Sequence, residues 1–170
     1  VAPPFDQFYT CFDLGPNSAV PGSWGGLTLS KTDKDVLLIG GAANTINGAL
    51  YNVRITRDEA CHLTGYHAEA PTVFAEAQYN DGGVTYGPDD VLFLTRYIVN
   101  ELGQQEWGST VTDKVIDLAP FAVTTAPGGA NFVPPGFGGA GAFKIVSWPS
   151  GDWYTVDLVP DGNGLFDVQS

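Results

Sequence analysis

The sequence has 170 residues, which suits a single domain of ordinary size. With 7 Lys and Arg against 19 Asp and Glu, the net charge of −12 disfavours a nucleic acid or an anionic membrane as partner, since both bind clustered basic residues. Hydrophobic residues make up 44% and charged residues 15%, so the chain can bury a core and is not a disordered acidic tail. No apolar run reaches the roughly 18 residues that a membrane span needs.

The N-terminal residues and the two cysteines favour an exported protein. The chain begins Val1-Ala2-Pro3-Pro4 without Met, as a mature end left by a signal peptide would; a chain trimmed at this point is the alternative. Cys11 and Cys61 are predicted to form one disulfide, with two free thiols as the alternative. We therefore expect the protein to be secreted, periplasmic or held at the cell surface.

The predicted strands form three copies of one repeat, and each copy begins with a Gly-Gly pair. The first copy places strands at 25–29, 35–40, 48–55 and 72–76. The second copy places them at 82–86, 90–95, 114–118 and 121–124, with a long loop at 97–113. The third copy places them at 128–132, 142–148, 152–158 and 165–168, with a hairpin turn at 161–164. The Gly-Gly pairs start 57 and then 46 residues apart.

This repeat predicts an all-β protein made of four-stranded antiparallel sheets. The apolar run in the second strand of each copy indicates burial on both faces, as in the stacked blades of a β-propeller. A Gly-Gly pair would let inner strands crowd near a central axis. We predict a single domain that is a partial β-propeller of about three blades, with a β-sandwich as the alternative. Its parts are an N-terminal strand within 5–15 and blades at about 25–77, 82–125 and 128–170.

The stretch from Gly82 to Thr95 resembles the blade motif of six-bladed propellers of the NHL and soluble sugar-dehydrogenase type. The wider chain, through 38–44, 100–104 and 131–137, resembles exported bacterial propeller proteins. The resemblance implies that three blades fill roughly half of a ring. A half ring would expose two apolar blade faces, which implies completion by self-association or by another protein chain.

The resemblance also gives the N-terminal strand a role in closing the ring. In a half ring this strand would pair with another chain or wrap onto the first blade. A bridge between Cys11 and Cys61 favours the second placement, because Cys61 follows the third strand of the first copy.

Asp81, just before an inner strand, is the first candidate site residue. In the soluble sugar dehydrogenases that the chain resembles, a His near this point is the general base and a quinone accepts the hydride. Asp81 could act there as a base or a calcium ligand, although a carboxyl group with a pKa of about 4 is a weak base at neutral pH. The alternative is an Asx turn that leads into the strand.

The second candidate group lies at the start of the predicted loop and consists of Arg96, Asn100, Glu101 and Gln104. Long loops are often functional. Arg96 could clamp a carboxylate or a sugar, and Glu101 could bind calcium. The alternative is a structural salt bridge from Arg96 to Asp81 or Glu101.

Other patterns favour structural roles. His62 and His67 are spaced and surrounded in a way that does not fit zinc. The segment 161–167 has some features of a calcium loop but is better interpreted as a hairpin turn. The tryptophans could stack on sugars but are expected to pack between blades; they are Trp24, Trp107, Trp148 and Trp153.

These observations predict a non-enzymatic, exported propeller module for binding or assembly, with calcium as a candidate ion. No Gly-x-Ser-x-Gly or phosphate-binding loop motif is present in the sequence. The alternative is a propeller enzyme of the sugar-dehydrogenase or lactonase type that uses a quinone or calcium in the central channel. Fold alone does not decide between them.

Overall fold

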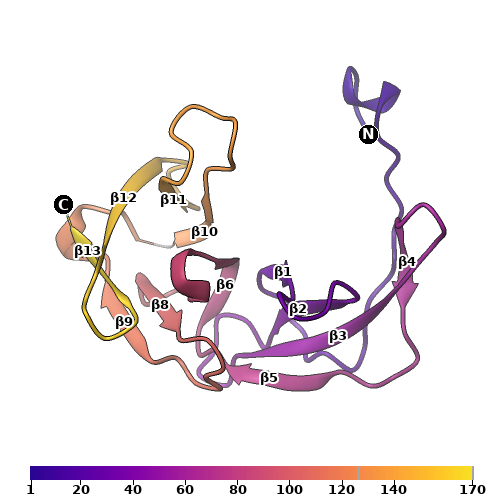
Figure 1. Ribbon diagram of the computed structural model, residues 1–170, viewed down its shortest axis with the longest axis horizontal. Helices are drawn as coiled ribbons and strands as arrows, with labels where there is room; N and C mark the ends of the chain where they lie inside the picture. Colours follow the sequence, from indigo (N-terminus) through magenta and orange to yellow (C-terminus); the bar gives the residue numbers. More distant parts are fainter. Residues whose placement is uncertain (126, 170) are drawn as a thin grey trace.

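The structure is a computed structural model that describes residues 1–125 and 127–169. It confirms the all-β class. Three antiparallel sheets of four or five strands follow one another along the chain and lie in an open arc (Figure 1). The helices in the described residues are single 3₁₀ turns, and none of them could cross a membrane.

The first sheet contains β1 (Leu27–Leu29), β2 (Val36–Gly41), β3 (Ala49–Arg57), β4 (Leu63–Tyr66) and β5 (Thr72–Glu76). β1, β2 and β3 form an antiparallel meander. β3 is long enough to pair with β5 along its first half and with β4 along its last residues. β4 and β5 therefore act as one outer strand that is interrupted by a loop.

The second sheet has the order β6 (Asn80–Tyr86), β7 (Leu92–Arg96), β8 (Glu101–Gln105) and β9 (Lys114–Asp117). The predicted long loop is wrong, because β8 lies within it. β8 carries few apolar residues, and its two glutamines are buried, so hydrophobic patterning could not reveal it. The predicted fourth strand at 121–124 is also wrong. η3 (Ala119–Phe121) ends at the first residue of this segment, and the sheet's fourth strand is β9.

The third sheet has the order β10 (Pro127–Phe132), β11 (Phe143–Ser147), β12 (Trp153–Pro160) and β13 (Phe166–Gln169). All four predicted strands are confirmed. The hairpin turn at 161–164 is confirmed too: the Asp161 Oδ1 atom accepts hydrogen bonds from the amides of Asn163 and Leu165. These bonds hold the turn.

The inner strands β1, β6 and β10 lie side by side at the centre of the arc (Figure 1). Their spacing depends on glycine. A Cβ atom at Gly26 would lie 2.6 Å from the Gly82 carbonyl oxygen, and one at Gly82 would lie 2.2 Å from the Gly128 carbonyl oxygen. The Gly26 amide donates a hydrogen bond of 2.6 Å to the Asp81 carbonyl oxygen. The expected crowding of inner strands at the Gly-Gly pairs is therefore confirmed.

The core lies between neighbouring sheets. Every residue of β7 is buried: Leu92 and Leu94 join the cluster shared with the first sheet, and Phe93 joins the larger cluster shared with the third. The Phe93 ring packs within 6 Å of three other phenylalanine rings, measured between centroids. Burial on both faces, predicted from the apolar run in 90–95, is thus confirmed for the middle sheet.

The two outer faces of the arc differ from the expected pair of exposed apolar faces. On the third sheet, the face turned away from the core is mixed: the polar residues Lys144, Thr155, Asp157 and Asp167 alternate with Val146, Val159 and the exposed Trp153. On the first sheet the outward residues are apolar but largely buried, and Val20 of the N-terminal segment packs with them. The members of that cluster are Leu37, Ile39, Val53 and Ile55. Only its edges are open, at Leu27, Leu29 and Val73.

The predicted N-terminal strand does not form. Residues 8–16 form no strand, and η1 (Phe5–Gln7) precedes them. The segment runs past β4 and along the first sheet (Figure 1). It lines a cavity together with His62 and Leu63, through Phe8, Tyr9, Thr10, Phe12 and Leu14. It thus follows the first sheet, as one of the two predicted placements has it, but as an irregular chain. Cys11 and Cys61 are both free and exposed, so the predicted disulfide is not formed.

The inner-strand contact leads to a first prediction. Gly82→Ala should lower the free energy of unfolding by about 2–3 kcal/mol, because its Cβ atom has only rigid backbone to displace. Gly129→Ala is the matched control, since a Cβ atom there would meet nothing within 4 Å. Urea unfolding of both variants measures the difference, and equal midpoints would contradict the close approach of β6 and β10.

Candidate functional site

The residues that meet at one end of the inner strands form a pocket of about 390 Å³. We call it the inner-strand pocket. All three sheets contribute to it, through strands β6 and β10 and through the turns that follow β2, β7 and β11. Its lining residues are Asn44, Asp81, Tyr97, Gly128 and Trp148.

Asp81 is the ionisable member of this pocket. It lies within β6 and not in the Asx turn that was the alternative. Its backbone is fixed by the bond to Gly26, and polar interactions with the Gly82 amide and the Asn44 side chain lower the pKa of its carboxyl group. Partial burial is the larger effect and raises the pKa of Asp81 above its ordinary value of 3.8. A carboxylate that is pushed toward its neutral form beside a cavity is a feature of binding and catalytic sites.

Sequence reasoning did not assign Asn44 or Tyr97 to a site, and it favoured packing between blades for Trp148 over stacking on a sugar. Asn44, Tyr97 and Trp148 each lie in the turn after the second strand of their repeat. Alignment of the three copies at this turn was the signal that could have found them. The Trp148 ring is 77% exposed, and Trp24, Trp107 and Trp153 are exposed as well. The expectation that the tryptophans pack between sheets is therefore wrong.

Arg96 and Glu101, which lie opposite each other on β7 and β8, form an ion pair. The Arg96 guanidinium bonds the Glu101 carboxylate, and its Nε atom donates to the Gln78 carbonyl oxygen at 3.0 Å. The guanidinium also lies over the Tyr79 ring, 5.6 Å from its centroid. Both residues belong to β-strands, and Arg96 is buried. The salt bridge that was the alternative interpretation is confirmed for Glu101 as partner.

Asn100 and Gln104 hold the chain together. Asn100 has a left-handed backbone with φ of 56°, and its Nδ2 atom donates to the Val123 carbonyl oxygen at 3.2 Å. Gln104 is completely buried and bonds the backbone of Phe166 twice: Nε2 donates to the carbonyl oxygen at 2.8 Å and Oε1 accepts from the amide at 2.9 Å. This pair of bonds joins the second sheet to the third.

The predicted calcium ligands are not brought together. Glu101 is committed to Arg96, and Asp81 lies in the inner-strand pocket without it. Within 1–125 and 127–169, no group of three or more His, Cys, Asp or Glu side chains could hold a metal ion. The residues present therefore do not fit a calcium site made of protein carboxylates.

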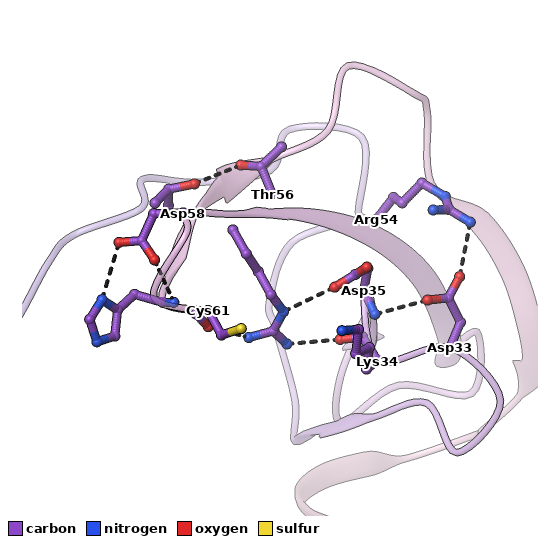
Figure 2. A network of polar contacts seen from close by, with 10 residues as sticks. Asp33, Lys34, Asp35, Arg54, Thr56, Asp58 and Cys61 are labelled. Carbon is purple, nitrogen blue, oxygen red and sulfur yellow. Dashed lines mark hydrogen bonds and ion pairs between the residues drawn. The ribbon is translucent and has the colours of Figure 1, made fainter.

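His62 belongs to a polar network at the far end of β3, shown in Figure 2. Its Nδ1 atom lies 3.1 Å from Asp58 Oδ2, and the Asp58 carboxylate also accepts the His62 amide, a bond that lowers the pKa of Asp58. Arg57 bonds Asp35 and the Cys61 carbonyl oxygen, which ties the β1–β2 turn to β3. These contacts are structural and lie away from the inner-strand pocket.

Comparison of the chain with protein-family models, with curated proteins and with solved structures gave no match. The likeness to six-bladed propellers therefore depends on the sequence motifs alone.

The raised pKa of Asp81 predicts a stability that changes with pH. Because the folded protein holds the proton more tightly than the unfolded chain, ionised Asp81 disfavours folding at neutral pH, and this penalty disappears as pH falls to 3.8. Asp81→Asn should therefore raise the urea midpoint relative to the wild type at pH 7. The difference should vanish near pH 3. A variant that is less stable than wild type at pH 7 would show that the carboxylate is not disfavoured.

Gln104 gives a third prediction. Gln104→Ala leaves the buried amide and carbonyl of Phe166 unpaired and should cost about 2–4 kcal/mol of stability. Gln169→Ala, on the exposed side of β13, is the control and should change stability by less than about 0.5 kcal/mol. Thermal and urea unfolding measure both. A Gln104→Ala variant that unfolds like the control would remove the argument that this side chain joins the two sheets.

Proposed function

We propose that this chain is a non-enzymatic binding module of β-propeller type and that the inner-strand pocket is its ligand site. One observation carries the proposal: side chains from corresponding turns of three successive sheets converge on a cavity beside a half-buried carboxylate. Sheets whose inner strands lie side by side around a common centre are the arrangement expected of propeller blades. Repeat scaffolds of this kind commonly present binding sites.

The chemistry of the pocket suits a neutral carbohydrate. Asp81 and Asn44 provide oxygen acceptors and an amide donor, which match the donor and acceptor pairs of sugar hydroxyls. Trp148 and Tyr97 provide ring faces against which the C–H surface of a sugar ring can pack. A carboxylate also disfavours anionic ligands, in keeping with the net charge of −12.

An enzyme of the sugar-dehydrogenase or lactonase type stays as the second candidate because of one observation, the raised pKa of Asp81. A carboxylate with a raised pKa is a better general base at neutral pH than an ordinary one. Reduction of a dye with an aldose and added quinone, or hydrolysis of a lactone with added calcium, would support this candidate. Loss of that activity in Asp81→Asn would assign it to the pocket.

The proposal includes an exported location and a protein partner or second copy that extends the arc. The exposed apolar surface that could hold a partner is smaller than the two bare sheet faces that the sequence predicts. It consists of the edges of the first sheet, where the side chains of Leu27, Leu29 and Val73 are exposed. Native mass spectrometry or light scattering tests it. A protein that remains an 18.0 kDa monomer at high concentration would contradict the self-association.

Sugar binding is the fourth prediction. A panel of neutral mono- and oligosaccharides, titrated by calorimetry or ligand-observed NMR, should contain a ligand that binds saturably. Trp148→Ala should weaken that binding at least tenfold, because it removes the stacking face. Trp153→Ala is the matched control, since Trp153 is as exposed as Trp148 but does not line the pocket. A panel without a binder, or equal loss in both variants, would overturn the carbohydrate proposal.

A further inference from the structure

Large apolar side chains that face solvent gather at the first-sheet end of the arc. Of the 17 such side chains that are exposed, 10 belong to residues 1–77, and five of these lie within residues 1–13, which we call the N-terminal arm. The five are Val1, Phe5, Phe8, Tyr9 and Phe12, and their exposed fractions run from 60% to 78%. Apolar side chains that gather at one place on a surface mark an interaction site.

The N-terminal arm has few ties to the rest of its own chain. All of its residues are exposed, and within the described part of the chain every hydrogen bond that it forms joins two residues of 1–15. The first bonds that anchor this region to the sheet come later, where the Pro21 and Ser23 carbonyl oxygens accept the amides of Ala42 and Ala43. Figure 1 shows the arm extending beyond β4, away from the other two sheets. A partner can therefore contact the arm without disturbing the sheets.

A cavity of about 580 Å³ lies between the N-terminal arm and the start of β4, and we call it the arm cavity. Its walls include Phe8 and Phe12 of the arm and His62 and Leu63 of the first sheet. Because the rings of the arm form part of the wall, they do not fill the space that they enclose. A cavity of roughly 150 Å³ is enough for benzene, so the arm cavity has room for aromatic side chains from another molecule.

A second copy of the chain is the partner that this surface fits. The aromatic side chains and the cavity that can receive them lie next to each other on one chain. A two-fold axis through this surface places the arm of each copy against the arm cavity of the other, so that one contact fills both cavities.

The charge distribution favours contact at the same end of the molecule. Residues 1–77 carry 4 of the 7 basic and 8 of the 19 acidic side chains, a net charge of −4, whereas residues 78–170 carry −8. Repulsion between two copies is therefore smallest where their first-sheet ends meet. The arm itself contains Asp6 and Asp13 and no Lys or Arg, so it does not suit an anionic membrane.

We propose that the N-terminal arm and the arm cavity form a two-fold symmetric interface between two copies of this chain. Phe8 and Phe12 of each copy pack into the arm cavity of the other, where they are removed from water. This inference rests on the self-association included in the proposed function, for which it names the surface. It does not depend on the sugar site, because the inner-strand pocket has none of these residues in its lining.

Sedimentation velocity of the full chain should show a dimer of 18.0 kDa subunits that dissociates on dilution. Phe8→Ser combined with Phe12→Ser should weaken dimerisation at least tenfold and leave sugar binding unchanged. Phe137→Ser is the matched control, since Phe137 is 69% exposed but lies in the turn between β10 and β11.

Three results would overturn the interface. One is a wild type that stays monomeric, which also removes the self-association. Another is a double variant that dimerises as tightly as the wild type, in which case self-association stands and only this surface is wrong. The third is a monomeric wild type that binds phosphatidylcholine vesicles through Phe8 and Phe12, which would assign the arm to a lipid surface.

The two cysteines test the placement of the arm directly. Cys11 belongs to the arm, Cys61 directly precedes His62 of the cavity wall, and both thiols are free and exposed. Cys11→Ser and Cys61→Ser each retain one thiol, on opposite sides of the proposed contact. A short bismaleimide added to an equimolar mixture of the two variants should link Cys11 of one copy to Cys61 of the other, as peptide mass spectrometry would detect. If the wild type gives this link within one chain and the mixture gives none, the arm packs only on its own sheet and the inference is wrong.

Discussion

The close approach of the three inner strands is the constraint on which the rest of the structure depends. At Gly26 and Gly82 the space that a methyl group would need is already occupied by backbone of the neighbouring strand. Because interiors are packed to the density of crystals, such contacts cannot be relaxed by moving a flexible side chain. They bring the second strands of adjacent sheets close enough for Leu92, Leu94 and Phe93 to fill the two spaces between sheets.

The same constraint positions the inner-strand pocket. Because the inner strands approach so closely, their own side chains cannot fill the space at the strand ends. The turns between strands form the walls of the pocket there. These turns carry Asn44, Tyr97 and Trp148, which face Asp81 of β6. A rigid centre with variable turns is a common way for folds to separate stability from recognition.

The sequence allowed the fold class and most strands to be predicted because Gly-Gly pairs and apolar runs are local signals. β8 was missed because Gln104 and Gln105 are buried polar residues whose partners, Phe166 and Glu76, are distant in the chain. Asp81 was found because it adjoins a Gly-Gly pair. Tyr97 was not found, and Trp148 was expected to pack between blades, since a turn residue shows its role only when three sheets are placed around one centre. Arg96, Asn100, Glu101 and Gln104 looked functional because their structural partners could not be recognised from spacing.

The two bonds between Gln104 and Phe166 have a consequence for how the molecule opens. The second and third sheets share the larger hydrophobic cluster and this pair of hydrogen bonds, whereas the first and second share a smaller cluster and the single hydrogen bond from Gln105 to the Glu76 carbonyl oxygen. Cooperative opening follows such differences in shared contacts. Amide protons of β7, β8 and β11 should therefore exchange together and last, and those of the first sheet should exchange earlier. The two final sheets then behave as one mechanical body, on which the first sheet can shift while still attached through β1 and β6.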